Sequence, residues 1–237
     1  MLLTIFLMGL GYILGSICSA IVVSRLFSLP DPRTEGSKNP GTTNVLRLAG
    51  KKYAIIVLLG DMLKGLIPVL LAKALGAGPL IASLTCLAAV LGHMYPLFFN
   101  FKGGKGVATT IGALLGLNLI LGVMVIATWL LIANFTRYSS LASLISILMS
   151  PIYSLFTIGR FEILGPLCCI ALFVLFQHRN NLTRLIDGTE PKMKFSPSLN
   201  EEVSAVLTDP TQESEPDEPD LRSPPPNNTR SAKKPDQ

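Results

Sequence analysis

The chain reads Phe101-Lys102-Gly103-Gly104-Lys105-Gly106 between two apolar segments, residues 79–99 and 107–117. Lysine and glycine are poor choices for a stretch that faces lipid, so this run predicts a polar connection between membrane segments. Its glycine-rich backbone exposes N–H groups beside two ammonium groups, an arrangement that binds phosphate and other oxyanions. A membrane protein that holds phosphate at its surface suggests lipid head-group chemistry or anion transport.

Apolar residues dominate the chain. Of its 237 residues, 49% are hydrophobic and only 15% are charged, whereas soluble domains usually carry about a quarter charged residues. Spanning segments must satisfy their own backbone hydrogen bonds, and these segments are too long and continuous for barrel strands. The apolar segments fall near 2–27, 53–75, 79–99, 107–117, 119–135, 140–157 and 162–177. We therefore predict an all-α, polytopic integral membrane protein with about seven transmembrane helices.

Positive charge gathers in alternate connections between these segments. The loops 28–52 and 100–106 are rich in lysine and arginine, and further arginines follow the fifth and the last segment. The opposite connections hold little beyond Lys73 and an Arg160/Glu162 pair. The positive-inside rule places the basic set in the cytoplasm. The N-terminus is then outside the cell and the C-terminus is cytoplasmic.

The same rule divides residues 107–135 into two elements. If Lys105 and Arg137 share a side, this stretch crosses an even number of times, yet it is too short for two full helices of about 20 residues each. We predict two short helices broken near 116–118, in a locally thinned or protein-lined region. The alternative is one long tilted helix, which would put Arg137 outside.

Charge also divides the chain into two parts. Residues 1–189 hold 14 Lys/Arg and 5 Asp/Glu, a net charge of +9, and residues 190–237 hold 6 Lys/Arg and 10 Asp/Glu, a net charge of −4. The basic part fits a membrane-embedded domain that handles anionic substrates or lies against anionic lipid, although positive-inside topology explains part of the excess. Pro, Glu, Asp, Ser and Asn dominate the rest, so residues 190–237 are predicted to form a disordered cytoplasmic tail.

Several common catalytic patterns are missing from the sequence. The four cysteines lie in apolar segments and are expected to be small core side chains, and no cluster of His, Cys and carboxylate residues predicts a metal site. The glycine run lacks the spacing and the Ser/Thr of a Walker A loop. No His is followed five positions later by Asp, the pair that many acyl-CoA-dependent acyltransferases use. We expect neither a metal nor a cofactor.

Two further polar groups are candidates for binding an anion. The loop 36–44 carries glycines and asparagines that permit inward-facing N–H groups, and it leads into Arg47, which can hold a phosphate in a bidentate manner. The alternative is an ordinary interfacial loop with a helix cap. Asp61 and Lys64 lie three residues apart inside the second apolar segment, where charges are costly unless they are paired or face a polar cavity. Lys64 is therefore either half of a structural ion pair or a group that reaches a polar site.

An ordered set of motifs resembles the bacterial PlsY family of membrane acyl-phosphate:glycerol-3-phosphate acyltransferases. The resemblance covers roughly residues 1–190 with matching order and spacing, and the set is specific although each motif alone would be weak. The matching residues are Gly36-Ser37-x-Asn39-Pro40-Gly41-x-Thr43-Asn44-Val45-Leu46-Arg47, Asp61-x-x-Lys64-Gly65, Gly92-His93, Gly103-Gly104-Lys105-Gly106-Val107-Ala108-Thr109, Arg137-Tyr138-x-Ser140-Leu141, His178-Arg179-x-Asn181 and Gly188-Thr189-Glu190.

The resemblance implies a fold, a reaction and a set of site residues. It implies a seven-helix enzyme with its site at the cytoplasmic face of the bacterial inner membrane, which moves an acyl group from acyl phosphate to glycerol 3-phosphate and releases lysophosphatidic acid and phosphate. An enzyme that makes acyl phosphate would be its functional partner. Catalytic roles are expected for Ser37, Arg47, Lys105, His178 and Asn181, and substrate-binding roles for Gly41, Thr43, Asn44, Lys64, Gly103, Gly104, Gly106 and Ser140. A structural role is expected for Glu190, paired with an arginine of a loop.

The residues fit this chemistry. Two phosphates must be held close together, so several cations are needed to offset their repulsion. Acyl phosphate is already activated, so we expect direct attack by the glycerol hydroxyl, with the leaving phosphate as proton acceptor or His178 as an alternative general base. The rival hypotheses are a transporter or channel for phosphorylated solutes and a catalytically silent lipid-binding protein. A transporter predicts polar residues through the membrane depth and an internal repeat, and neither is evident.

Overall fold

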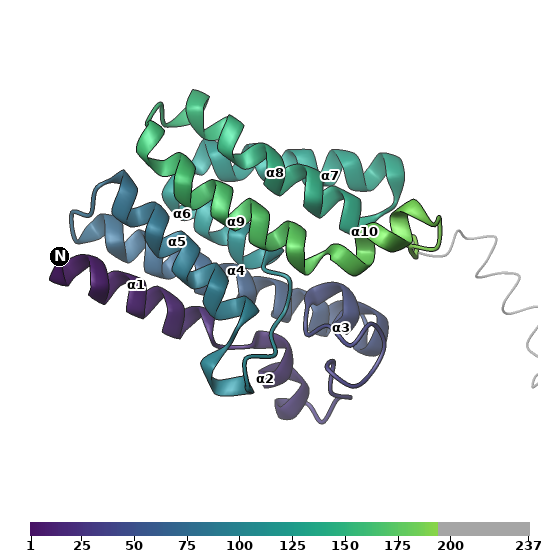
Figure 1. Ribbon diagram of the computed structural model, residues 1–237. Coiled ribbons are helices and arrows are strands. Elements are labelled where there is room, and N and C mark those ends of the chain that lie inside the picture. Colours follow the sequence, from purple (N-terminus) through teal and green to yellow (C-terminus); the bar gives the residue numbers. More distant parts are fainter. Residues whose placement is uncertain (194–237) are drawn as a thin grey trace, which may run out of the picture. The chain divides into compact units, whose positions relative to one another are not determined.

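The structure is a computed structural model and describes residues 1–193 (Figure 1). The prediction of disorder for 190–237 falls almost entirely outside these residues. All regular elements in the described part are helical, and the first compact unit extends to Met193, beyond the boundary predicted at 189. The elements are α1 (Leu2–Gly15), α2 (Ser19–Leu26), α3 (Thr42–Ala49), α4 (Lys51–Ala74), α5 (Pro79–Met94), η1 (Leu97–Phe99), α6 (Val107–Leu117), α7 (Leu119–Thr136), α8 (Ser139–Thr157), η2 (Phe161–Ile163), α9 (Leu164–Gln177) and α10 (Arg179–Ile186).

Five helical stretches of residues 1–193 are long and apolar enough to cross a membrane, and a bent pair makes a sixth. The five are Leu2–Leu26, Lys51–Ala74, Pro79–Phe99, Leu119–Thr136 and Ser139–Thr157, and the sixth joins Phe161–Gln177 to Arg179–Ile186 across a 60° bend. Only α6 is a shorter apolar helix, with 11 residues. The prediction of an all-helical, multi-pass protein is confirmed, whereas the count of seven and the sidedness of the termini stay predictions.

The predicted break near 116–118 is present. α6 ends at Leu117, and Asn118 adopts an extended backbone and accepts a hydrogen bond from Leu121 N–H at 3.0 Å, which caps α7. On the other side of the break, Lys73 Nζ donates to Gly116 O at 3.1 Å and to Leu117 O at 3.2 Å, so it satisfies carbonyls that the end of α6 leaves unpaired. Two helices therefore occupy residues 107–136, as predicted, and not one long helix. The prediction that both are short is right only for α6, because α7 has 18 residues and is long enough to cross a membrane.

We expect Lys73→Met to weaken the fold without touching the chemistry. The substitution keeps the apolar stem but removes a charged donor from two carbonyls, so the apparent melting temperature of purified protein should fall by about 3 °C. Thermal unfolding in detergent, followed by size-exclusion fluorescence, measures the effect. An unchanged melting temperature would show that the cap contributes nothing.

The helices of the membrane unit approach closely through glycine. A Cβ on Gly65 of α4 would lie 2.1 Å from Thr109 O of α6, and a Cβ on Gly92 of α5 would lie 2.2 Å from Tyr12 O of α1. Small residues at such crossings are how membrane helices gain contact area, since lipid provides no hydrophobic drive for their association. α6 packs extensively on α4 and α1 on α5, while α7 lies alongside α8 (Figure 1).

Three features of the fold differ from the pattern of apolar segments. The segment 2–27 is not one helix but breaks between Gly15 and Ser19, and a short amphipathic helix, α3, lies inside the loop 28–52. After the last apolar segment the chain bends by 60° at His178 and continues as a further short helix, α10. The break between α1 and α2 places Ile17 O beside Lys64 Nζ, and the bend at His178 brings Asn181 to Lys105.

Candidate active site

The predicted catalytic lysine lies at one end of a chain of polar contacts. Lys105 Nζ, from the loop before α6, donates to Asn181 Oδ1 on α10. Asn181 Nδ2 donates to Glu190 Oε1 at 2.7 Å, and Arg184 Nε donates to Glu190 Oε2 at 2.8 Å. The structure thus brings together Lys105, Asn181 and Glu190. Glu190 pairs with an arginine, as predicted, but this is Arg184 of helix α10 and not an arginine of a loop. Asn181 lies one turn into α10, so the bend at His178 is what aims it at Lys105.

Burial and neighbouring charge prepare Lys105 to bind an anion. The pKa of Lys105 is lowered to about 8, chiefly because burial removes the ammonium from water; Glu190 raises this pKa, and Arg184 and Arg47 lower it. Burial alone would raise the pKa of Glu190, but the side chains of Ser140, Asn181 and Arg184 lower it below its usual value, so the carboxylate stays ionised. An anion beside Lys105 would raise this pKa and so stabilise the charged form of the lysine.

Arg47 and His178 complete this polar end of the unit. Arg47 is exposed on α3 and has no ion-pair or hydrogen-bond partner within residues 1–193, so its guanidinium is available to a ligand. His178 Nδ1 lies 2.8 Å from Val174 O, and because a carbonyl only accepts, Nδ1 carries the proton. Nε2 of the neutral ring is then the basic nitrogen, as a general base requires.

The first turns of α3 and α8 lie together beside this group. Thr43 Oγ1 of α3 is 3.5 Å from Ser139 Oγ, next to the predicted Ser140, and Thr42 Oγ1 is buried with no hydrogen-bond partner in the described part of the chain. The structure therefore places two predicted residues, Thr43 and Ser140, at one junction. Ser37 is exposed on the preceding loop.

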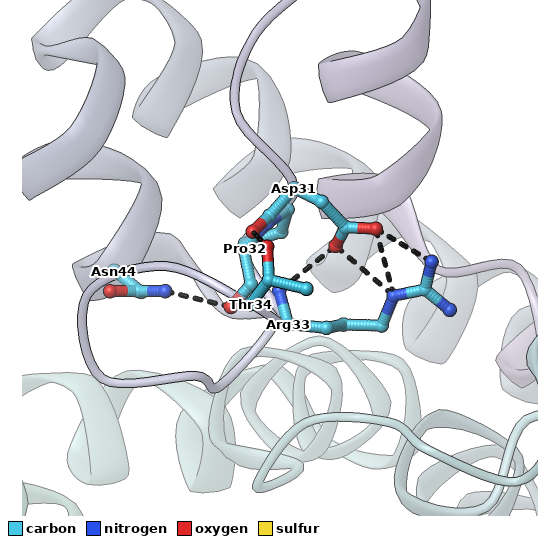
Figure 2. Close-up of polar contacts among 5 residues, drawn as sticks. All are labelled: Asp31, Pro32, Arg33, Thr34 and Asn44. Carbon is cyan, nitrogen blue, oxygen red and sulfur yellow. Dashed lines mark hydrogen bonds and ion pairs between the residues drawn. The ribbon is translucent and has the colours of Figure 1, made fainter.

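The structure gives Asn44 a different role from the predicted binding of a ligand. Its Nδ2 donates to Pro32 O at 2.9 Å and to Glu35 O at 3.0 Å, and its Oδ1 accepts from Ser37 N–H at 2.9 Å. Figure 2 shows the bond to Pro32 beside the bidentate pair of Arg33 with Asp31. All three hydrogen-bonding groups of the amide are used internally, so Asn44 shapes the loop that presents Ser37.

Lys64 is likewise occupied within the protein. Its Nζ lies 2.8 Å from Asp61 Oδ1 and donates to Ile17 O at 2.7 Å, where the chain breaks between α1 and α2. Both side chains are almost fully buried. Of the two interpretations of this lysine, the ion pair is the one present, and direct contact of Lys64 with a substrate is not supported by this geometry.

The glycines act differently from the predicted oxyanion cradle. Gly103 N–H donates to Met94 O and Gly104 N–H donates to His93 O, each at 3.2 Å. These two amides therefore bond to carbonyls at the end of α5 and not to an anion. A Cβ on Gly103 would lie 2.0 Å from His93 O. Gly106 has φ +84°, a conformation that favours glycine, and Gly41 N–H donates to Asn39 O. These glycines permit close packing and turns that place Lys105.

A basic pocket of about 340 Å³ adjoins this loop. Its cations are Lys38 and Lys102, which are exposed, and Arg33, which is paired with Asp31. These cations are absent from the predicted site residues, although Lys102 is one of the two ammonium groups in the run that was expected to bind an oxyanion. Lys38 and Lys102 sit inside the quoted motifs beside Ser37 and Gly103, so their charge was the available signal. The remaining lining residues are Pro40, Met94, Tyr95, Phe101, Gly103 and Gln177.

Comparison with known proteins places the whole membrane unit in one family. The sequence model of the family described as Glycerol-3-phosphate acyltransferase matches residues 5–188. A glycerol-3-phosphate acyltransferase of Legionella pneumophila strain Corby is 62% identical over 203 residues, which are 86% of this chain and 73% of the relative. One from Vibrio cholerae strain M66-2 is 48% identical over 200 residues, covering 83% of this chain and 95% of the relative.

Solved structures agree with the sequence relatives. The fold is similar to a crystal structure of PlsY, an integral membrane glycerol 3-phosphate acyltransferase in its glycerol 3-phosphate form, with a TM-score of 0.76, 38% identity and coverage of 86% of this chain and 98% of that one. The lysophosphatidic acid form of PlsY gives a TM-score of 0.74 and 39% identity over 81% of this chain and 95% of that one. The resemblance read from the motifs is confirmed, and this chain belongs to the PlsY family of integral membrane glycerol-3-phosphate acyltransferases.

Proposed function

We propose that this enzyme transfers a fatty acyl group from acyl phosphate to the sn-1 hydroxyl of glycerol 3-phosphate, giving lysophosphatidic acid and inorganic phosphate. The observation that carries the proposal is the partly buried Lys105 ammonium, which donates to Asn181. Arg47, which has no hydrogen-bond or ion-pair partner in residues 1–193, is close enough to influence the pKa of Lys105. Neither side chain forms a salt bridge with a carboxylate in residues 1–193, so both cations are available to bind a phosphate monoester. The relatives crystallised with glycerol 3-phosphate and with lysophosphatidic acid support both ends of this reaction.

The proposed reaction is a direct acyl transfer. The glycerol hydroxyl oxygen attacks the acyl carbonyl carbon, the bond from that carbon to the phosphate oxygen breaks, and the hydroxyl proton passes to the leaving phosphate or to His178 Nε2. Lys105 and Arg47 offset the repulsion between the two phosphates and stabilise charge on the leaving group. No acyl-enzyme is needed, so isolation of a stable acyl ester on Ser37 or Ser140 would contradict direct transfer.

We place the phosphate of the acyl donor towards the basic pocket. Lys38 and Lys102 supply exposed cations there, and neither is among the residues that hydrogen-bond to Asn181 within residues 1–193. Replacing both lysines by glutamine should raise KM for acyl phosphate about ten-fold while KM for glycerol 3-phosphate changes less than two-fold, because each lost charge weakens phosphate binding. Steady-state kinetics with each substrate varied in turn measures this, and an equal rise in both KM values would contradict the assignment.

The positive charge of the connecting loops also suggests where in the cell the enzyme acts. We place the site on the cytoplasmic face of the bacterial inner membrane. The acyltransferase domain, predicted from the sequence to end at residue 189, is extended here to Met193, so that it includes Glu190 of the site network. The donor is membrane-bound and chemically activated, so a separate enzyme that makes acyl phosphate must supply it. The basic connections 28–52 and 100–106 carry Lys38, Arg47, Lys102 and Lys105, which is the support for the cytoplasmic face.

The pKa of Lys105 predicts an alkaline limit to activity. In the free enzyme this pKa is lowered to about 8, so the ammonium is present below pH 8 and is lost as the pH rises through that value. Since kcat/KM reports the free enzyme, kcat/KM for glycerol 3-phosphate should fall about ten-fold per pH unit above 8. A profile that stays flat to pH 10 would show that this ammonium is not required.

Donor specificity tests the function directly. Purified protein in lipid is given palmitoyl phosphate or palmitoyl-CoA with labelled glycerol 3-phosphate, and lysophosphatidic acid is followed by chromatography. We expect product from palmitoyl phosphate and none from palmitoyl-CoA. Product only from palmitoyl-CoA would overturn the donor, and no product from folded protein with either donor would favour anion transport, which flux into liposomes would then show.

A further inference from the structure

The loop that carries Lys105 is docked on the imidazole of His93. Gly104 N–H bonds to His93 O, and a Cβ on Gly104 would lie 2.3 Å from His93 Nε2 and 3.0 Å from Cε1. The loop backbone therefore rests against the edge of the ring with no space for a side chain. Because Lys105 is the next residue, the position of its backbone follows the position of His93.

His93 is supported in turn by a buried ion pair on α4. Its Nδ1 lies 3.7 Å from Asp61 Oδ1, and the same oxygen lies 2.8 Å from Lys64 Nζ. The three side chains are 4%, 2% and 5% exposed for His93, Asp61 and Lys64, so all lie inside the protein. Lys64 also donates to Ile17 O, which ties the cluster to the break between α1 and α2. The chain of contacts thus runs from α1 through α4 and α5 to the Lys105 loop.

Buried charge in a membrane unit is expensive, and apolar packing would hold two helices together at lower cost. A charged cluster directly beneath the substrate-binding loop therefore points to a role in placing that loop. We propose that Asp61, Lys64 and His93 form a positioning cluster for the proposed reaction, which holds the 102–106 loop so that the Lys105 ammonium is kept partly out of water and within reach of Asn181. This inference deepens the proposed function and rests on it.

The proposal has a signature that loss of stability alone does not produce. Lys105 is faced by Asn181 and Arg184 of α10, by Glu190, by Arg47 of α3 and by His178 at the bend, and the burial of its ammonium is the largest cause of its lowered pKa. A loop released from His93 would let water reach this ammonium. The pKa of Lys105 would then rise from about 8 towards the ordinary lysine value of 10.5.

Two lysines of the same helix provide a matched comparison. Lys64 and Lys73 both lie on α4, and each donates to carbonyls at a helix break, Ile17 O for Lys64 and Gly116 O and Leu117 O for Lys73. Only Lys64 belongs to the positioning cluster, through its ion pair with Asp61. Asp61→Asn/Lys64→Met removes both charges of the pair without leaving one unpaired, and Lys73→Met removes the other helix cap.

The experiment measures the titration of Lys105 without turnover. Full-length protein in lipid is pulsed with acetic anhydride at pH 6 to 11, and acetylation of Lys105 is read by mass spectrometry. We expect a midpoint near 8 in the wild type and in Lys73→Met, and a midpoint at least one pH unit higher in Asp61→Asn/Lys64→Met, which slows acetylation about five-fold at pH 8. Because only neutral amine reacts, the result does not depend on the assigned activity.

A second variant approaches the same contact from the loop side. Gly104→Ala places a methyl group against His93 Nε2 and should raise the Lys105 midpoint in the same direction, together with a fall in kcat/KM and a matching shift of its alkaline limit. A midpoint that stays near 8 in both Gly104→Ala and the double variant would overturn the positioning role. An equal shift in Lys73→Met would also overturn it, since general loosening would then explain the effect. Shifted midpoints in a protein that makes no lysophosphatidic acid would keep the positioning of Lys105 and remove the proposed reaction.

Discussion

Lys105→Ala is expected to lower kcat about a thousand-fold, which is the largest effect of any single substitution in this site. The substitution removes the ammonium that Asn181 holds and leaves two phosphates with one fewer cation between them. Binding of both substrates weakens too, but the loss is greatest where charge develops on the leaving phosphate. Initial rates of phosphate release by purified protein in lipid, with palmitoyl phosphate and glycerol 3-phosphate both saturating, measure it.

Two variants make this result specific. Lys105→Arg keeps the positive charge but replaces the compact ammonium by a planar guanidinium, so partial activity is expected. Because a guanidinium stays charged well above pH 8, the alkaline limit should also move upward. Lys192→Ala is a matched control, because Lys192 lies at the same end of the unit but its Nζ sits 5.6 Å from the Tyr138 ring centre and makes no contact with Asn181. Activity of Lys105→Ala within ten-fold of the wild type would mean that the site is misplaced.

Arg47→Ala is expected to lower kcat/KM for glycerol 3-phosphate about a hundred-fold. Arg47 is the exposed guanidinium of α3 that has no partner in residues 1–193, so its fork is available for bidentate binding of a phosphate. Its proximity also helps to lower the pKa of Lys105, so the alkaline limit of the variant should move upward. Steady-state kinetics across pH 6 to 10 separates these two effects.

Arg179→Ala is the control for Arg47→Ala. Arg179 is a second arginine of the basic end, but its guanidinium lies 4.6 Å from the Phe176 ring centre and donates to Phe176 O at 3.1 Å, so it is satisfied within its own helix turn. We expect its kinetics to stay within two-fold of the wild type. Equal losses in both variants would indicate a general effect of surface charge and would remove the specific role of Arg47.

The membrane architecture was predictable because its signals are local. Continuous apolar segments and the count of residues between Lys105 and Arg137 were enough to predict the break at Asn118. The resemblance of ordered motifs singled out Lys105, Asn181 and Glu190 as site residues, but their mutual hydrogen bonds emerged only from the structure. In each case the residues on which the prediction depends lie within a short stretch of sequence or recur at the spacing of a motif.

Other features depend on contacts between distant residues. The break between α1 and α2 occurs in an apolar run, and the carbonyl of Ile17 is satisfied by Lys64, 47 residues away in sequence. The amides of Gly103 and Gly104 looked available for an anion because nothing in the sequence shows that the carbonyls of His93 and Met94 lie opposite them. Asn44 is a similar case. Its side chain bonds to Pro32 O, 12 residues earlier, and the sequence alone does not indicate the loop conformation that brings the two together.

The central claim is tested most directly by the stoichiometry of one reaction. Purified protein in lipid is given palmitoyl phosphate with and without glycerol 3-phosphate, and phosphate and lysophosphatidic acid are measured in the same samples. Direct acyl transfer predicts that phosphate release requires glycerol 3-phosphate and that the two products form in a one-to-one ratio. Phosphate release that is independent of glycerol 3-phosphate, or the absence of lysophosphatidic acid from folded protein, would contradict it.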